Sequence, residues 1–350
     1  MDKYDDTILV TGGSGFLGSH VVDALIAQGR FRVVAVSRNP TRYCNQEAQY
    51  MPCDITNHNE VAAIIEQIKP IAIIHTATPG PFAPEFLHRK DHAATKNLVQ
   101  IATQFSSVRA FVYTGSAEAM KNVSGARGKP LSETEAILHT PSTAPSGYAH
   151  AKSASDALVL QANDVSLATA TLRLPAVYGP RETKDSGIAT NFMSLANTFA
   201  TRIQLGNNEV VLDWVYVENA AHAHVLAVNT LLQPQRCADG EAYFVTDGAP
   251  VKLWDFVRSV WTASGDENCN SIKKVIIPWW VVLALAATIE VLFRIFTLDR
   301  KSPPLTRLHV RYVKDGAWFS IGKARECLGY EPLVSTSEGI ERTVAWLKHA

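Results

Sequence analysis

The chain has 350 residues, 47% of them hydrophobic and 19% charged, which excludes a disordered or fibrous protein and allows a sizeable core. Its 33 Lys and Arg balance its 33 Asp and Glu, so no global field favours nucleic acid or an anionic surface as a partner. The cysteine count is odd and lacks the short spacings of zinc or redox motifs, which indicates free thiols in a reducing compartment. The cysteines are Cys44, Cys53, Cys237, Cys269 and Cys327.

The N-terminal residues are polar and acidic, and a strand pattern follows them directly. No signal peptide is therefore expected. We predict an intracellular protein, located in the cytoplasm or on the cytosolic face of an endoplasmic-reticulum-type membrane.

Short apolar runs then alternate with helical patterns along the chain. Such alternation predicts parallel βαβ units, and solidly apolar strands are typical of a sheet covered on both faces. We therefore expect an α/β fold, a Rossmann-type doubly wound parallel sheet. The predicted strands are 7–10, 31–36, 71–74, 110–113 and 168–174, and the predicted helices are 16–28, 59–68, 92–105 and 148–163.

The regularity of this pattern weakens after Pro180. Residues 1–180 are predicted to form the dinucleotide-binding core, with 211–250 contributing late strands and a helix. Residues 181–210 and 251–350 are expected to form a smaller substrate-binding region.

A glycine-rich turn follows the first predicted strand. Glycine there permits a tight turn, close approach of the backbone to a pyrophosphate, and close packing of helix on strand. Because the turn also opens a helix, whose N-terminus favours phosphate charge, it predicts dinucleotide binding rather than a plain loop. The residues of this turn are Gly12, Gly13, Gly15, Phe16, Leu17 and Gly18.

The second predicted strand does not end in the acidic residue that would bind the adenosine ribose of NAD. Ser37 and Arg38 stand there instead. Arg38 could pair with a 2′-phosphate and Ser37 could hydrogen-bond it, which favours NADP(H) over NAD(H); the alternative is that Arg38 only faces solvent. Asp54, after the next apolar stretch, could accept a bond from the adenine amino group or cap its own loop.

Tyr148 and Lys152 are four residues apart, on one face of a predicted helix. A phenol, with an ordinary pKa of about 10, needs a nearby cation to exchange a proton with an alcohol at neutral pH. Lys152 would supply that charge and could also hold the nicotinamide ribose. Ser116, just past the fourth strand, could hydrogen-bond the substrate oxygen, and Thr114 is the second candidate for this role.

With the glycine turn, these residues resemble an extended short-chain dehydrogenase/reductase. The similarity is strongest to the 3β-hydroxysteroid dehydrogenase/isomerase branch, which includes the fungal sterol-4α-carboxylate 3-dehydrogenases. It covers nearly the whole chain. The matching segments are 11–18, 75–79, 95–98, 148–152, 172–180, 213–219, 318–321 and 328–332, together with Asp54, Ser116, His222 and His224.

The resemblance implies that Tyr148 is the acid/base, Lys152 its activator and Ser116 the ligand of the substrate oxygen. It places Ile55 beside Asp54 in the cofactor-binding set, and it implies no metal. Gly115 is a departure, because these enzymes commonly carry another hydroxyl residue there. The resemblance also places Thr76, Ala77 and Thr78 along the phosphate-ribose side of the cofactor, and Pro175 and Val177 beside the nicotinamide amide.

The expected reaction is hydride transfer between a nicotinamide cofactor and a secondary alcohol or ketone of a bulky, apolar, sterol- or terpenoid-like substrate. One alternative keeps Ser116, Tyr148 and Lys152 but makes the chain a non-redox isomerase of a polycyclic terpenoid or ketosteroid-like substrate. A second is a dinucleotide-binding protein without activity, against which the complete Ser/Tyr/Lys set argues. By analogy with relatives, the helix carrying Tyr148 could form a homodimer interface.

Residues 275–289 carry no charge, and Glu290 and Arg294 then interrupt an apolar continuation to Leu298. This uncharged stretch is shorter than the roughly 20 residues that span a bilayer. Two interpretations remain open. The segment is a helix buried in the smaller region, or it is an interfacial anchor with Trp279 and Trp280 at the headgroup boundary, giving peripheral membrane contact through 275–298.

Overall fold

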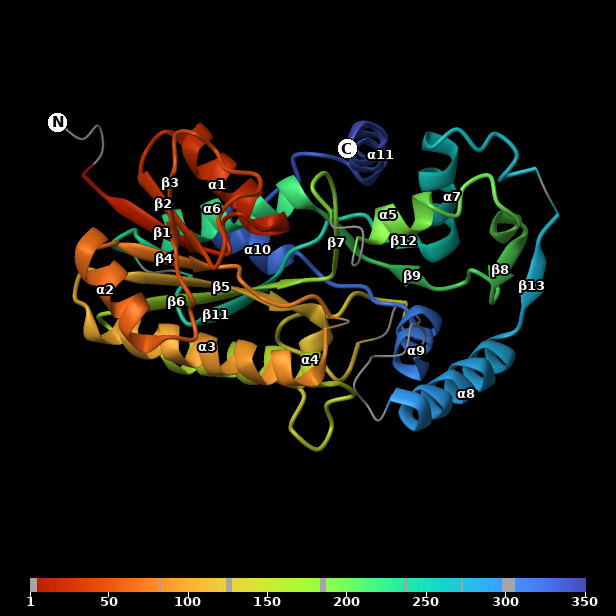
Figure 1. Cartoon of the computed structure of the whole chain (residues 1–350), viewed down its shortest axis with the longest axis horizontal. Helices are drawn as coiled ribbons and strands as arrows, with labels where there is room; N and C mark the ends of the chain where they lie inside the picture. Colours follow the sequence, from red (N-terminus) through yellow and green to blue (C-terminus); the bar gives the residue numbers. More distant parts are fainter. Residues whose placement is uncertain are drawn as a thin grey trace.

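The computed structural model describes residues 5–81, 83–123, 128–182, 187–235, 238–271, 273–297 and 306–350. Cys237 and Leu298 lie outside the described residues. A large parallel sheet with helices on both faces fills one side of the molecule, and smaller elements form a lobe on the other side (Figure 1).

The central sheet has seven strands in the order β11-β6-β5-β4-β1-β2-β3, and every neighbouring pair is parallel. The chain runs outward from β1 in one direction and from β4 in the other, so the topological switch point lies between β1 and β4. Ligands of such sheets bind there, beyond the carboxyl ends of the strands. The predicted doubly wound fold is confirmed. The strands are β1 (Thr7–Thr11), β2 (Arg32–Ser37), β3 (Gln49–Pro52), β4 (Ala72–His75), β5 (Ala110–Ser116), β6 (Ala168–Leu174) and β11 (Glu241–Phe244).

Two helical layers cover the sheet (Figure 1). Successive residues of a strand point to opposite faces, so Ile8 and Val10 pack in one core and Leu9 in the other. The first core is closed by α1 (Phe16–Gln28), α6 (Val217–Leu231) and α10 (Gly322–Leu328), and the second by α2 (His58–Ile68), α3 (Glu85–Gln104) and α4 (Gly147–Gln161). Because α10 lies in the first core, part of the range 251–350 packs on the sheet.

The predicted boundaries of helices and strands agree best with the observed ones where the sequence signal is local. The helix 16–28 and the strand 168–174 coincide with α1 and β6. The helix predicted at 92–105 begins earlier, at Glu85 after Pro84, because its first turns are too polar to show an apolar period. Strand β3 was not predicted, since its short sequence Gln49–Pro52 carries exposed and half-buried residues rather than an apolar run.

The smaller lobe is built from short strands and helices around an apolar cluster of its own. In this cluster, Trp214 stacks on Phe256 with ring centroids 3.9 Å apart. Its strands pair two by two: β7 with β10, β9 with β12, and β8 with β13. The elements are β7 (Ala176–Tyr178), α5 (Ile188–Met193), η3 (Phe199–Arg202), β8 (Ile203–Leu205), β9 (Val211–Leu212), β10 (Trp214–Tyr216), β12 (Val251–Lys252), α7 (Leu253–Ala263), β13 (Val275–Ile277), α8 (Trp279–Thr297), α9 (Arg307–Asp315) and α11 (Thr336–His349).

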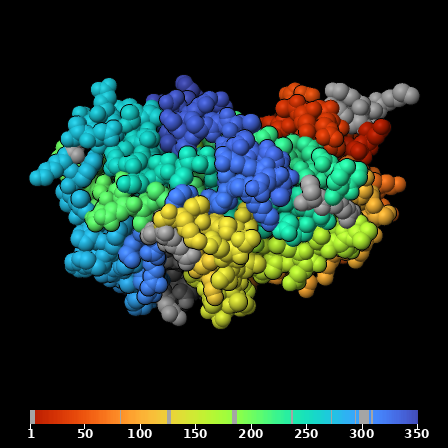
Figure 2. Space-filling view, turned by 180° about the vertical axis from the view of Figure 1, so that it is seen from behind, coloured from red at the N-terminus to blue at the C-terminus, as the bar shows by residue number. Residues whose placement is uncertain are grey.

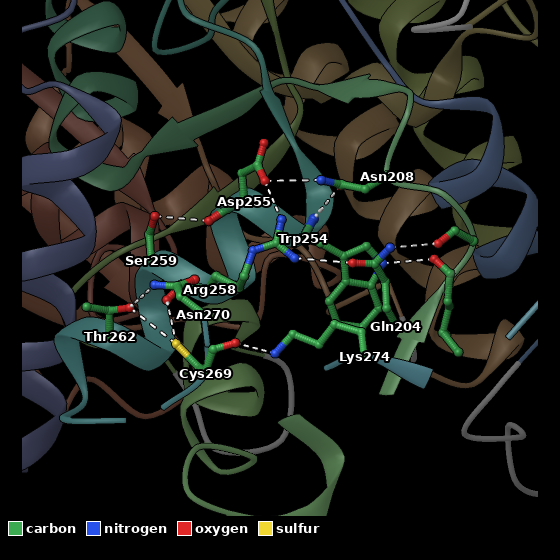
Figure 3. A network of polar contacts seen from close by, with 12 residues as sticks. Gln204, Asn208, Trp254, Asp255, Arg258, Ser259, Thr262, Cys269, Asn270 and Lys274 are labelled. Atoms are coloured by element: carbon green, nitrogen blue, oxygen red, sulfur yellow. Dashed lines mark hydrogen bonds and ion pairs between the residues drawn. The ribbon is translucent and has the colours of Figure 1, made fainter. Parts of the chain in front are cut away.

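A polar network fixes the end of this lobe where β8 meets α7 (Figure 3). Arg258 on α7 donates to Gln204 on β8 at 3.2 Å and to Asp255 at 2.5 Å. The indole nitrogen of Trp254 donates to the Leu205 carbonyl at 2.8 Å. Lys274 donates to the backbone carbonyl of Cys269 in the same network. Lys274 also donates to the Thr201 carbonyl of η3 at 2.9 Å, so the segment that leads into β13 and α8 is anchored to the lobe.

The interpretation of 275–289 as a buried helix is wrong. The segment forms β13 and the start of α8, and only one face of α8 is covered, with Val282 and Ala286 packed against Val310 of α9. The other face is open: Trp280 is 72% exposed and Phe296 is 80% exposed. No helix among the described residues meets the length and apolarity needed to cross a membrane. In the view from behind, this segment lies at the opposite end of the molecule from the N-terminal residues (Figure 2).

Candidate active site

The glycine turn lies at the carboxyl end of β1, where close packing leaves no space for side chains. Gly12 has a φ of +73°, and a Cβ there would lie 2.8 Å from the Cα of Ala77. A Cβ on Gly18 would lie 2.2 Å from the Gly12 carbonyl oxygen, and one on Gly13 would lie 2.6 Å from the Ala35 Cβ. Strand, turn and helix α1 thus approach each other as a dinucleotide site requires.

The N-terminus of α1 provides the phosphate side of this turn. Gly15 is exposed, and among the described residues no side chain caps the helix or places a carboxylate in its first turn. Its first backbone N–H groups can therefore bind an anion. Phe16 and Leu17, which open the helix, are partly buried against the apolar cluster of the smaller lobe.

The end of β2 lies next to the turn, because the hydroxyls of Ser37 and Ser14 are 2.7 Å apart. Arg38 is exposed and lies close enough to Asp54 to help lower the pKa of that carboxyl. The main cause of the low Asp54 pKa is Thr56, whose N–H and hydroxyl both donate to Asp54 Oδ1, at 3.0 and 2.8 Å. Asp54 thus caps its own loop, while Ile55 packs against the core below the sheet.

The three residues of the loop after β4 that were expected beside the cofactor make different contacts. The Thr76 hydroxyl donates to the Thr11 carbonyl at 2.7 Å and is committed to the sheet. The backbone of Ala77 faces Gly12 across the turn. The Thr78 hydroxyl donates to Asp91 at 3.0 Å. Pro175 connects β6 to β7 and Val177 lies within β7, beyond the carboxyl end of β6.

Ser116, Tyr148 and Lys152 come together at the carboxyl end of β5. Ser116 is buried at the last position of that strand and shares a hydrogen bond with Tyr148, in the first turn of α4. The Lys152 Nζ lies 6.0 Å from the centre of the Tyr148 ring. Thr114, the other candidate for the substrate oxygen, is bonded to His224 at 2.8 Å, away from Tyr148.

Gly115, between these two hydroxyl residues, sits against β6. A Cβ at this position would lie 2.6 Å from the γ-methyl of Thr171 and 3.2 Å from the Leu172 carbonyl oxygen. The departure from the family pattern therefore has a steric reason: the methyl group of Thr171 fills the space that a side chain at 115 would need.

Lys152 is held firmly against β5. It is only 2% exposed, and its Nζ donates to the Thr114 carbonyl at 3.1 Å and to the Tyr113 hydroxyl at 3.3 Å. Burial lowers the Lys152 pKa, while the nearby carboxylates of Asp91 and Asp156 raise it.

The Tyr148 pKa is raised above its ordinary value. Burial is the main cause, the charge of Glu118 the next, and Asp91 adds to them, while the hydrogen bond with Ser116 acts in the opposite direction. Lys152 was expected to favour the phenolate, but burial and the two carboxylates dominate the Tyr148 pKa. Tyr148 therefore holds its proton at neutral pH in the protein alone.

Sequence reasoning missed several residues around Tyr148. Glu118 follows Ser116 closely and donates its N–H to the Ser116 hydroxyl at 3.2 Å; burial raises the pKa of its carboxyl to about 7. Tyr312 of α9 is close enough for Glu118 and Tyr148 to raise its pKa. The His88 ring meets the Tyr148 ring edge-on at 5.4 Å. Only the position of Glu118 beside Ser116 could have signalled such a role, because the other contacts are tertiary.

Neither a metal centre nor a reactive thiol stands out among the described residues. Within the described ranges, no group of three or more His, Cys, Asp or Glu side chains is placed to hold a metal ion. The described cysteines, Cys44, Cys53, Cys269 and Cys327, are unpaired. Burial raises the pKa of the Cys53 thiol to about 11, so that thiol is protonated at neutral pH.

The sequence pattern of the 3-beta hydroxysteroid dehydrogenase/isomerase family matches residues 9–275. The decarboxylating sterol-4-alpha-carboxylate 3-dehydrogenase of Schizosaccharomyces pombe is 32% identical over 98% of this chain and 97% of its own length. That of Gibberella zeae is 33% identical over 83% of this chain and 96% of its own. A UDP-glucose 4-epimerase of Thermus thermophilus, solved in complex with NAD, shares the fold: its TM-score is 0.71 at 22% identity, covering 98% of this chain and 99% of the epimerase.

Proposed function

The chain belongs to the 3-beta hydroxysteroid dehydrogenase/isomerase family, and we propose that it is an NAD(P)-dependent oxidoreductase acting on a secondary alcohol or ketone of a bulky, apolar, sterol- or terpenoid-like molecule. One observation carries this proposal: Ser116, Tyr148 and Lys152 meet at the carboxyl ends of the parallel strands, the same end of the sheet at which the glycine turn lies. The dehydrogenase names of the relatives favour redox chemistry over the isomerase alternative.

The residues at the carboxyl ends of the strands fit a dinucleotide. The glycine turn and the N-terminus of α1 would hold its pyrophosphate, and Lys152 its nicotinamide ribose. When bound, the nicotinamide supplies the carbon that accepts or donates hydride. In alcohol oxidation, Ser116 hydrogen-bonds the substrate oxygen and Tyr148 takes the hydroxyl proton. At neutral pH Tyr148 is protonated, which is the form that gives a proton to a carbonyl oxygen in the reverse direction.

The test is single-turnover absorbance at 340 nm with NAD, NADP and their reduced forms, using a panel of hydroxy- and keto-sterols and terpenoids. We expect a cofactor-linked change that is stoichiometric with product. Product without any absorbance change would instead support the isomerase. Neither product nor cofactor binding would contradict the proposal.

We propose further that the cofactor is NADP(H), with Arg38 paired to the 2′-phosphate and Ser37 beside it. Arg38→Ala should weaken NADPH binding about tenfold or more, because a hydrogen bond to a charged group contributes about 1.5–3 kcal/mol. NADH binding should be nearly unchanged. Titration of intrinsic fluorescence measures both. Arg109→Ala is the control, since this exposed Arg precedes β5 and so lies at the amino ends of the strands, away from the glycine turn. Equal losses for both cofactors in Arg38→Ala would rule out the pairing.

We propose peripheral membrane contact through the open face of α8. Its exposed Trp280 and Phe296 suit a headgroup boundary. An ion pair of 2.7 Å between Glu290 and Arg307 joins α8 to α9. Helix α9 in turn carries Tyr312, which lies close to Tyr148. The double variant Trp280→Glu/Phe296→Glu should lose co-sedimentation with phosphatidylcholine vesicles. Val165→Glu, at a site 91% exposed between α4 and β6, should not. Equal sedimentation of both variants would refute the contact.

A further inference from the structure

Alcohol oxidation releases one proton for each hydride transferred, and this proton must reach the solvent. Lys152 is only 2% exposed, and Tyr148 lies one helical turn before it on α4. A bound cofactor and substrate would cover both side chains further. The contacts that lead from Lys152 toward the surface therefore decide where the proton can go.

A row of hydrogen bonds leads from Lys152 to a neighbouring helix. An ammonium group has three N–H bonds to donate. The Lys152 Nζ donates to the Thr114 carbonyl at 3.1 Å and to the Tyr113 hydroxyl at 3.3 Å. The Tyr113 hydroxyl shares a hydrogen bond with the hydroxyl of Ser155 on α4. Tyr113 and Ser155 are 1% and 0% exposed, so this part of the row is shielded from solvent.

The row ends at an imidazole on α3. The Nδ1 of His92 and the hydroxyl oxygen of Ser155 are 2.9 Å apart. Helices α3 and α4 lie side by side on one face of the sheet (Figure 1). His92 is half-buried between them, whereas Ser155 is fully buried, so His92 is the first residue of the row that reaches solvent.

The protonation states of these groups suit proton transfer. Burial, together with His150 and Lys96, lowers the pKa of His92, so the imidazole is neutral at pH 7 and can accept a proton at Nδ1. Burial raises the pKa of Tyr113 far above its ordinary value, so that phenol keeps a proton to pass on. Burial also lowers the pKa of Lys152, which makes a temporary loss of its proton easier.

We propose that Tyr113, Ser155 and His92 form a proton relay that connects Lys152 to the solvent between α3 and α4. The inference rests on the proposed function, because it concerns the release of the proton that Tyr148 takes from the alcohol.

Each step of the relay breaks one bond to hydrogen and forms another. The Lys152 ammonium gives a proton to the Tyr113 oxygen while the Tyr113 hydroxyl gives its own to Ser155. The Ser155 proton passes to Nδ1 of His92, and His92 releases its Nε2 proton to water. The neutral Lys152 amine then takes the proton of Tyr148, whose ring centre lies 6.0 Å from Nζ, through one bridging water. One substrate proton thus reaches the solvent, and Lys152 is charged again.

The experiment measures isotope effects on alcohol oxidation with a substrate identified in the sterol and terpenoid panel. Solvent D2O slows proton release, and deuterium on the reacting carbon slows hydride transfer. In Ser155→Ala and His92→Ala, kcat should fall about tenfold or more, because a positioned proton-transfer group contributes about 10²–10⁴-fold. The solvent isotope effect should rise and the carbon isotope effect should approach one, since proton release then limits turnover. Imidazole added to the buffer should restore His92→Ala, because it replaces the lost ring.

Ser153→Ala is the matched control, because Ser153 is also buried on α4 and its hydroxyl donates to the His150 carbonyl, at 3.0 Å. Its turnover and both isotope effects should equal those of the parent. Unchanged turnover in Ser155→Ala and His92→Ala would overturn the relay. Slower turnover with a retained carbon isotope effect and no rescue by imidazole would also overturn it, because that result shows only looser packing of α3 on α4.

Tyr113→Phe tests the inner end of the relay and covers the case in which another variant does not fold. It removes the hydroxyl and keeps the ring, whose centre lies 4.9 Å from the Lys152 Nζ. Its isotope effects should change in the same direction as those of Ser155→Ala. Failure of the inference is distinct from failure of the proposed function: in the first, the parent oxidises alcohol and the variants keep its isotope effects; in the second, the parent itself shows no cofactor-linked turnover.

Discussion

Tyr148→Phe is expected to lose turnover by about 10²–10⁴-fold, the usual contribution of a positioned acid/base group. The variant lacks only the phenolic oxygen, and the ring still packs edge-on against His88. Because Lys152 is held by Tyr113 and the Thr114 carbonyl, its position does not depend on the lost hydroxyl. Cofactor affinity should therefore stay close to that of the parent.

Stopped-flow absorbance at 340 nm measures the turnover of this variant, and fluorescence titration measures its cofactor binding. Ser116→Ala is the companion variant, since it removes the hydrogen bond to Tyr148 and to the substrate oxygen while keeping the acid/base itself. It should lose less than Tyr148→Phe. Turnover of Tyr148→Phe near the parent level would remove Tyr148 from the mechanism.

Arg173→Met should destabilise the protein by about 3–5 kcal/mol, the range found when one partner of a buried ion pair is removed. Arg173 and Asp156 join β6 to α4 by two hydrogen bonds of 2.9 Å, and their side chains are only 7% and 0% exposed. The substitution leaves a buried carboxylate without its partner, four residues after Lys152 on α4. Urea unfolding followed by circular dichroism measures the loss.

Two further variants distinguish the effect of the buried charge on stability from a general loss of packing. Arg342→Met breaks two exposed ion pairs, with Glu338 on α11 and with Glu218 on α6, and should cost only about 0–1 kcal/mol for each. The double variant Arg173→Met/Asp156→Leu removes both charges and should recover much of the stability, because an apolar pair of similar volume replaces the ions. A double variant no more stable than Arg173→Met would show that packing, not charge, dominates.

The local parts of the fold and site could be predicted because their signals lie within a few residues. Helix α1 and the glycine turn are adjacent in the chain, and Tyr148 and Lys152 share one helix face. Those patterns depend on backbone sterics and helix geometry alone. The observed turn, in which Ala77 closes on Gly12, is the packing such a motif requires.

The other features of the candidate active site could not be predicted, because they depend on tertiary contacts. Thr114 and Ser116 are equivalent in a strand pattern, and only the bond from His224 on α6 distinguishes them. Asp91 and Tyr312 reach the pair from α3 and α9, far away in the chain. Apolar composition alone likewise could not show whether the α8 face is covered by protein, since coverage is decided by what packs on it.

The tight fit of Gly115 against the methyl of Thr171 links two positions on neighbouring strands. Neither residue can change freely while the other stays. A related chain with Ser or Ala at position 115 needs a smaller residue at position 171, so the two positions should vary together across descendants of a common ancestor. In this chain, a hydroxyl residue at position 115 should therefore be accommodated only together with a smaller residue at position 171.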